Sequence, residues 1–195
     1  MIYEPEEDSF LLEKEIRKLS NGKKILDMGS GSGIQARAAI EAGAKEVLAV
    51  DIDEEAIREL RKKGIDAIKS NLFEKVKGKF DLIVFNPPYL PEDKREDGES
   101  AKVTTGGKKG DEIILRFLKA VEKYLEKEGK ILIVLSSLTP KERILKILEK
   151  EGLKKEVLAK RKIFMEELEI WKIFFQTKIS TYLSKVKLRN HPPYY

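Results

Sequence analysis

Short apolar runs alternate with helical patterns along most of this 195-residue chain. Residues 24–28 and 46–50 are apolar runs of buried-strand length, and each precedes a helical pattern that ends at a glycine, Gly43 or Gly64. This alternation of strand and helix predicts a mostly parallel sheet with helices on both faces. Expected strands lie at 24–28, 46–50, 65–69, 80–85, 131–135, 154–162 and 168–175, and expected helices at 10–19, 34–42, 56–60, 111–127 and 140–150.

The last two expected strands follow one another without a helix between them, which predicts an antiparallel pair at one edge of the sheet. The length fits one domain, and we assign residues 1–175 to it, with 1–22 as a leading segment. Residues 176–195 form a basic tail, which we expect to be a flexible terminus. Docking of the tail on the body, or contact with a partner, is the alternative.

Composition excludes several kinds of chemistry. The chain has no cysteine, and His191 is its only histidine, so disulfides, thiolate zinc sites and histidine catalysis are not expected. No apolar run approaches the roughly 20 residues that span a bilayer, and the acidic start is unlike a signal peptide, so we expect a soluble cytoplasmic protein. The richness in Lys and Glu also favours a thermophilic source.

The net charge of +5 is concentrated at one end of the chain. The tail contains Lys178, Lys185, Lys187 and Arg189 and no acid, so it contributes +4 and leaves +1 for the other 175 residues. Composition alone therefore does not argue for a broad nucleic-acid-binding face.

A glycine-rich turn, Asp27-Met28-Gly29-Ser30-Gly31-Ser32-Gly33, joins the first expected strand to a helix. Glycine lets the chain turn sharply and lets a ligand approach the backbone. The dinucleotide fingerprint needs its third glycine at position 34, where this chain has Ile34. Asp27 would attract a cationic ligand and repel a pyrophosphate. The turn therefore predicts a site for a positively charged ligand.

A second motif, Asn86-Pro87-Pro88-Tyr89, directly follows the apolar run 80–85. Two prolines cannot donate to a sheet ladder, so the motif must end the strand. It leaves an amide and an aromatic ring at the carboxyl end of the strand, where open α/β sheets bind ligands. The alternative is a rigid turn without a chemical role.

Together the two motifs resemble the class I S-adenosylmethionine (SAM) methyltransferases that methylate planar nitrogens. The resemblance implies a seven-stranded sheet with the last strand antiparallel, and SAM as cofactor with S-adenosylhomocysteine as product. It places the methionyl ammonium near Asp27 and the glycines Gly29, Gly31 and Gly33. Asp51 would bind the ribose hydroxyls, because Asp53 is the better helix cap.

The resemblance assigns the adenine to Asn71 and to the backbone N–H of Leu72. The family more often has Asp at the place of Asn71, so a plain turn asparagine is the alternative there. At the reacting end, the Asn86 side-chain oxygen and the Pro87 carbonyl would accept hydrogen bonds from the target NH2, and Asn86 would also contact the cofactor. Pro88 would fix the backbone, and Tyr89 would pack on the flat face of the target.

The opening Tyr3-Glu4-Pro5-Glu6-Glu7-Asp8-Ser9-Phe10-Leu11-Leu12 resembles the short archaeal and eukaryotic branch of the HemK/PrmC family. In that branch this stretch lies over the cofactor, and a hydroxyl at the place of Ser9 contacts SAM. A helix cap by Asp8 or Ser9 is compatible with this role. Thr105-Gly106-Gly107-Lys108-Lys109-Gly110 is similar to the family's Gly-Gly-x-x-Gly step after the substrate loop.

The resemblance implies N5-methylation of the glutamine in the Gly-Gly-Gln motif of a class 1 peptide-chain release factor. It also implies a small zinc-binding activator that pairs along the third strand, where residues 65–68 are expected to expose alternating apolar side chains. Residues 90–110 are expected to form a mobile substrate-gating loop, with disorder as the alternative. The alternatives are N6-adenine or N2-guanine methylation of RNA or DNA, and a non-enzymatic SAM-binding scaffold.

Overall fold

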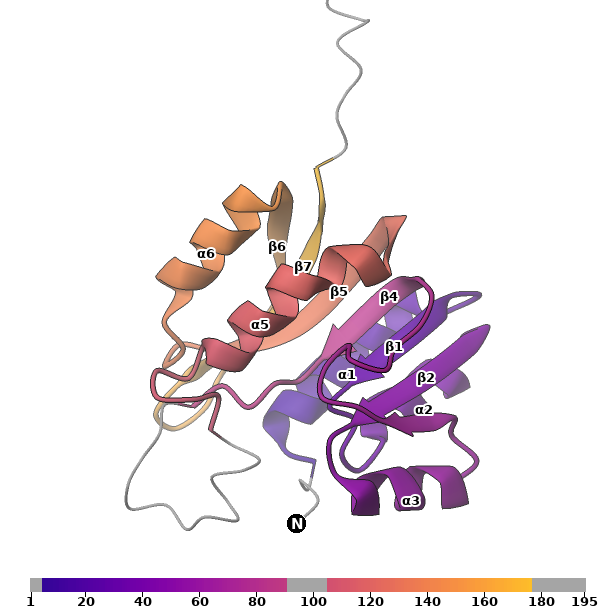
Figure 1. The fold of residues 1–195 in the computed structure, drawn as a ribbon. Coiled ribbons are helices and arrows are strands. Elements are labelled where there is room, and N and C mark those ends of the chain that lie inside the picture. The colour runs from indigo at the N-terminus through magenta and orange to yellow at the C-terminus, as the bar shows by residue number, and fades with distance from the viewer. Residues whose placement is uncertain (1–4, 91–104, 177–195) are drawn as a thin grey trace, which may run out of the picture.

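Seven strands form one mixed sheet in the order β3-β2-β1-β4-β5-β7-β6 (Figure 1). The computed structural model describes residues 5–90 and 105–176. The helices are α1 (Glu7–Leu19), α2 (Ile34–Glu41), α3 (Glu54–Lys62), α5 (Glu112–Ala120) and α6 (Lys141–Lys150), with a 3-10 turn at Val121–Tyr124. The strands are β1 (Lys24–Met28), β2 (Glu46–Asp51), β3 (Ala67–Lys69), β4 (Phe80–Phe85), β5 (Leu125–Ser136), β6 (Leu153–Lys162) and β7 (Glu167–Phe175).

Strands β1 to β5 are parallel, and β7 runs antiparallel to both β5 and β6. The expected seven-stranded class I sheet and its antiparallel last strand are therefore confirmed. The strand order reverses at β1, which lies between β2 and β4. In open parallel sheets such a switch point creates a crevice at the carboxyl ends of the strands.

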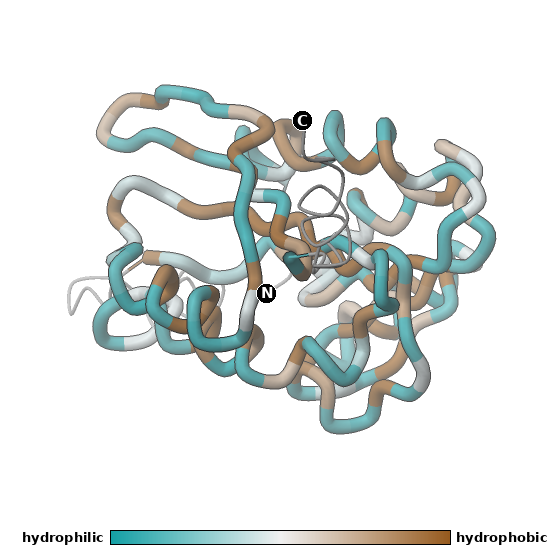
Figure 2. Tube along the Cα trace, turned by 90° about the horizontal axis from the view of Figure 1, so that it is seen from above, coloured by the Kyte–Doolittle hydropathy of each residue, from teal (hydrophilic) through white to brown (hydrophobic). Residues whose placement is uncertain are grey.

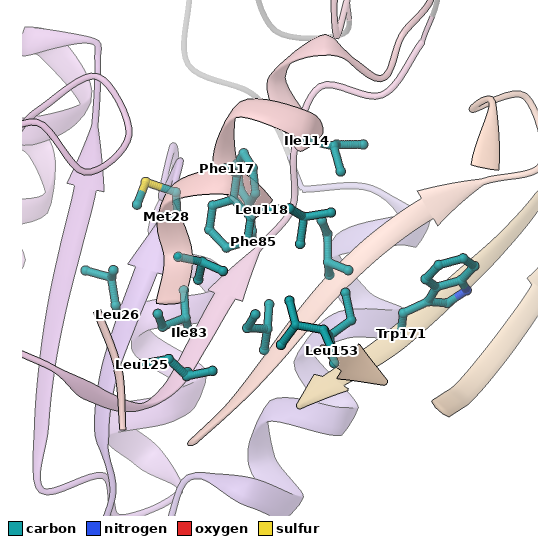
Figure 3. Packing of buried hydrophobic residues seen from close by; sticks show 14 of the residues in the cluster. Leu26, Met28, Ile83, Phe85, Ile114, Phe117, Leu118, Leu125, Leu153 and Trp171 are labelled. Carbon is teal, nitrogen blue, oxygen red and sulfur yellow. The ribbon is translucent and has the colours of Figure 1, made fainter. Parts of the chain in front are cut away.

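Helices cover both faces of the sheet. On one face, α5 and α6 pack on the central strands, and Phe117 lies against Phe85 with ring centroids 4.7 Å apart (Figure 3). On the other face, α1 and α2 bury Leu12 and Ile16 against β1, β4 and β5. In Figure 2 the helical segments alternate between hydrophilic and hydrophobic stretches. This is expected for amphipathic helices that pack one face on the sheet.

Three expected elements differ in extent. The helix expected at 111–127 ends at Ala120, because Leu125 is buried in β5 beside Phe80, and the spacing of Val121 and Leu125 fits either element. For the same reason β5 is much longer than the expected 131–135. The strand expected at 65–69 begins only at Ala67, since Ile65 packs beneath α3.

The third strand also differs in what it exposes. Ile65 and Ala67 are buried and Ile68 is half-buried, so the expected row of exposed apolar side chains is wrong. The outer backbone edge of β3 has no neighbouring strand among the described residues, however, because β3 is the first strand of the sheet.

Two expectations fall mainly on residues outside the described ranges: the gating loop, of which 91–104 are not described, and the basic tail from 177. Leu90 and Thr105, on either side of the first gap, form a bridge, and the Gly106 N–H donates to the Leu90 carbonyl at 2.9 Å. Within the described ranges no helix is long and apolar enough to cross a membrane.

Candidate active site

A cavity of about 750 Å³ opens at the carboxyl ends of β1, β2, β3 and β4. Its volume lies in the range of sites that enclose cofactor-sized ligands. The structure brings most of the predicted site residues to its wall: Ser9, Gly29, Gly31, Asp51, Asn71, Leu72, Asn86, Pro87, Pro88 and Tyr89. Asp27 and Gly33 do not line it.

The glycine turn forms one wall of the cavity. Gly29 and Gly31 have φ values of 66° and 50°, in the left-handed region that residues with a Cβ rarely adopt. Gly33, at φ 84°, serves packing instead, because a Cβ there would lie 2.5 Å from the Leu60 side chain of α3. Of the three glycines in the turn, the first two line the cavity and the third does not.

Asp51 sits at the end of β2, and its carboxylate is already tied to the turn. One oxygen accepts from the Gly31 N–H at 2.8 Å and the other from the Asp53 N–H at 2.8 Å. Each carboxylate oxygen keeps a further acceptor site for a ribose hydroxyl. Asp53 caps α3 by accepting from the Glu55 N–H at 2.9 Å, so the alternative role of Asp51 as the helix cap is wrong.

The predicted adenine contacts lie after β3. The Asn71 side-chain oxygen accepts from Arg116 at 3.2 Å, and its amide nitrogen donates to Glu74 at 2.9 Å. Leu72 is the one non-glycine residue of the described ranges with a positive φ, 49°. Such strain is concentrated at functional sites, which supports a backbone role for Leu72.

Asp27 lies behind the glycine turn and not on its cavity side. Its side chain is 2% exposed and accepts from the Ala36 N–H at 3.0 Å, which ties it to the first turn of α2. Burial is the main cause that raises the pKa of this carboxyl to about 7. The predicted contact between Asp27 and an ammonium group therefore has no support in the geometry.

At the opposite wall, Asn86 is held by α1. Its amide nitrogen donates to the Asp8 carboxylate at 3.1 Å and approaches the Ser9 hydroxyl at 3.5 Å. The Tyr89 hydroxyl donates to the same Asp8 oxygen at 3.2 Å. Because a carboxylate accepts and cannot donate, Asp8 fixes the Asn86 amide with its nitrogen toward α1. The Asn86 oxygen is then buried and has no hydrogen-bond partner among the described residues.

The backbone of the Asn-Pro-Pro-Tyr turn is held from two more sides. The Thr139 hydroxyl donates to the Tyr89 carbonyl at 3.2 Å. Gly106 packs so closely on the Pro88 carbonyl that a Cβ there would lie 2.5 Å from its oxygen. The Gly-Gly-x-x-Gly step therefore supports the turn directly.

Sequence reasoning missed two residues of this site. Asp8 was considered only as a helix cap, but α1 begins at Glu7 and Asp8 makes no such cap. Gln35, in the first turn of α2, lines the cavity and was assigned no role. Neither role has a local signal in the sequence, because the bonding partners are distant: Asp8 acts on Asn86, 78 positions away, and Gln35 bonds to Ser9, 26 positions away.

The hydrogen-bonding groups of the cavity suit SAM. The cavity combines the backbone of two glycines, a carboxylate at Asp51 and two buried amide oxygens, those of Gln35 and Asn86, that have no hydrogen-bond partner in the described part of the chain. A ligand with several N–H and O–H groups can satisfy such acceptors. Among the described residues no group of His, Cys, Asp or Glu could hold a metal ion.

The fold and the site define a class I SAM-dependent methyltransferase. The family model described as methyltransferase small domain matches residues 6–165. A protein of Methanocaldococcus jannaschii named "Putative protein N5-glutamine methyltransferase MJ0928" is 40% identical, over 87% of this chain and 89% of its own. The human protein named methyltransferase HEMK2 is 32% identical, over 88% of each chain.

Among solved structures, one match is the E. cuniculi Mtq2–Trm112 complex, described as responsible for methylation of the eRF1 translation termination factor. It superposes with a TM-score of 0.74 at 26% identity, and covers 90% of this chain and 99% of the matched one. The chain therefore belongs to the methyltransferase small domain family, and within it to the short HemK-type branch.

Proposed function

We propose that the protein methylates the N5 nitrogen of the glutamine in the Gly-Gly-Gln motif of a class 1 peptide-chain release factor. The observation that carries the proposal is the buried Asn86 oxygen, which has no hydrogen-bond partner within residues 5–90 and 105–176 and is held in orientation by Asp8. The names of the relatives and the description of the Mtq2–Trm112 complex support a protein glutamine as the acceptor.

The side-chain amide of glutamine is a poor nucleophile, because its nitrogen lone pair is delocalised into the carbonyl. Asn86 and the Pro87 carbonyl accept one N–H each and so hold the nitrogen with its lone pair aimed along the line of attack. Tyr89 packs on the flat face of the amide. These three groups bind and orient the acceptor, and they exclude competing orientations.

SAM supplies an electrophilic methyl group on a sulfonium sulfur. Transfer forms a nitrogen–carbon bond and breaks a carbon–sulfur bond, after which the nitrogen loses one proton to water. Asp51 would hold the ribose, and Leu72 and Asn71 would hold the adenine. Gly29 and Gly31 allow the backbone to approach the ligand, Gly33 supports the turn from behind, and Ser9 closes the site from α1.

The experiment offers radiolabelled SAM in parallel to a release factor, its Gln→Ala variant at the Gly-Gly-Gln motif, tRNA, rRNA and DNA. We expect label on the release factor and none on its variant. Label only on nucleic acid would show the alternative, an RNA or DNA amino-group methyltransferase. Methyl transfer that is unaltered by Asn86→Ala would instead assign the catalytic role to another protein.

We further propose that a small zinc-binding activator pairs along the outer edge of β3. The Asp66 carbonyl and the Ser70 N–H form hydrogen bonds with β2. Because backbone groups alternate in direction along a strand, those of Ala67 and Lys69 point to the outer edge. The Arg61 guanidinium covers the outward Ala67 carbonyl at 2.8 and 3.0 Å. An added strand would take the place of this contact.

A proline at position 69 removes an outward N–H and leaves the inner ladder to β2 intact. We therefore expect Lys69→Pro to abolish co-purification with the activator while SAM binding persists. Full activity and solubility of the wild-type protein without any partner would contradict the pairing.

A further inference from the structure

Gln35 is a buried amide at the wall of the cavity whose role the glycine turn does not explain. The side chain is 4% exposed and lies in the first turn of α2. Its amide nitrogen donates to the Ser9 carbonyl of α1 at 3.0 Å. This bond fixes the orientation of the amide, because a reversed amide would set its oxygen against the Ser9 oxygen.

The other atom of this amide is unsatisfied. The Gln35 oxygen is buried and has no hydrogen-bond partner among the described residues. A buried acceptor without a donor is costly, so its presence in a ligand cavity points to a donor that the ligand provides.

The position of Gln35 identifies the end of the cofactor that it faces. Asp51 ends β2, and Asn71 and Leu72 follow β3; together they form the end predicted for the ribose and adenine. Gln35 is bonded to Ser9, whose hydroxyl lies 3.5 Å from the Asn86 amide nitrogen, so it belongs to the reacting end. At that end the only N–H donor of SAM is the methionyl ammonium, since the sulfonium and the carboxylate have no hydrogen to donate.

The carboxylate predicted for this ammonium, Asp27, and the carboxylate beside Asn86, Asp8, have other partners. Asp27 does not line the cavity and bonds to the Ala36 N–H. The Asp8 carboxylate accepts from Asn86 and Tyr89. We infer that the Gln35 side-chain oxygen accepts a hydrogen bond from the α-ammonium of the cofactor and selects ligands that carry this group. The inference rests on the cofactor of the proposed function and is independent of which methyl acceptor is used.

The test compares two ligands and two proteins by calorimetry. S-adenosylhomocysteine and its analogue without the α-amino group are titrated into the wild type and into Gln35→Met, which has a similar shape but no amide. A hydrogen bond to a charged group is worth about tenfold or more in affinity. We therefore expect the preference of the wild type for S-adenosylhomocysteine to fall by about tenfold in Gln35→Met. Gln176→Met, at the chain's other glutamine, which is exposed after β7, is the matched control and should keep the wild-type preference.

Gln35→Glu separates the two functions of the amide, because it keeps an acceptor and loses the donor to Ser9. We expect it to retain the preference for the amino-bearing ligand, and it provides the answer if Gln35→Met does not fold. Equal weakening of both ligands in Gln35→Met would assign Gln35 to the α1–α2 contact alone and overturn the inference. Loss of the preference in Gln35→Glu would overturn it as well. Because no methyl acceptor is present, these results do not depend on where the label goes in the transfer experiment.

Discussion

The carboxylate of Asp8 lies 3.1 Å from the amide nitrogen of Asn86, and the two residues are 78 positions apart in the chain. The same oxygen accepts from the Tyr89 hydroxyl at 3.2 Å. The first helix thus orients both polar side chains of the Asn-Pro-Pro-Tyr turn. This makes Asp8 a positioning residue, since it acts on the methyl acceptor through Asn86.

Asp8→Ala should lower kcat by about tenfold to a hundredfold, because a misplaced catalytic amide costs that much in rate. KM for SAM should change little. Asp8→Asn is the control, since its side-chain oxygen can still accept from Asn86, and its loss should be smaller. Steady-state kinetics of methyl transfer measure both. Equal effects on kcat in the two variants would show that the carboxylate charge, and not the orientation of Asn86, is what matters.

Asn86→Ala removes one of the two proposed acceptors for the target amide. Loss of one such hydrogen bond at a reacting group lowers kcat by about a hundredfold or more. We expect S-adenosylhomocysteine still to bind, because the glycine turn and Asp51 are untouched. Single-turnover transfer and calorimetry on the same preparation check the two parts. A parallel loss of ligand binding would mean that Asn86 acts on the cofactor and not on the acceptor.

Asp27 should make the folded state sensitive to pH. Its pKa is raised from 3.8 to about 7 in the folded protein, so folding favours the protonated form. Its contribution to stability is fully present below about pH 4 and is lost as the pH rises through about 7. The shift corresponds to at most about 4 kcal/mol in the free energy of unfolding.

Asp27→Asn is the matching variant, because it is neutral and its oxygen can still accept from the Ala36 N–H. Urea unfolding between pH 4 and 8 should show the variant gaining stability relative to the wild type as the pH rises. A difference that stays constant across this range would rule out the raised pKa.

Gly106→Ala should damage the turn at Pro88. The added Cβ would lie 2.4 Å from the Gly110 carbonyl oxygen and 2.5 Å from that of Pro88, and backbone atoms cannot move aside as a flexible side chain can. We expect lower activity and a lower Tm. Gly64→Ala is the control, because nothing lies within 4 Å of its Cβ and only the left-handed φ of 75° adds strain, roughly 1 kcal/mol. If both variants behave alike, close packing at Gly106 is not the cause.

The sequence predicted the sheet and the two motifs that line the cavity, because both depend on local patterns. The runs at β1 and β4 have the expected bounds, and the motifs that follow them lie at the edge where parallel strands end. Where a pattern fitted two structures, as for Val121 and Leu125, the prediction chose the wrong one. The resemblance contributed what spacing could not, above all the strand order and the cofactor.

The contacts between α1 and the turn could not be predicted in the same way. A carboxylate in a helical first turn looks like a cap or a solvated charge, and only the tertiary fold brings Asp8 to Asn86. Asp27 shows the opposite error. Its charge suggested a ligand contact, but in the fold it lies behind the turn and serves the start of α2.

The attachment of α1 has a consequence for incompletely folded molecules. This helix packs on one face of the sheet through Leu12 and Ile16, and its first turn places Asp8 at the site. A chain whose α1 has not yet docked could still form the glycine turn. The side-chain amide of Asn86 would then have no fixed orientation. Methyl-transfer activity therefore indicates that α1 has docked on the sheet.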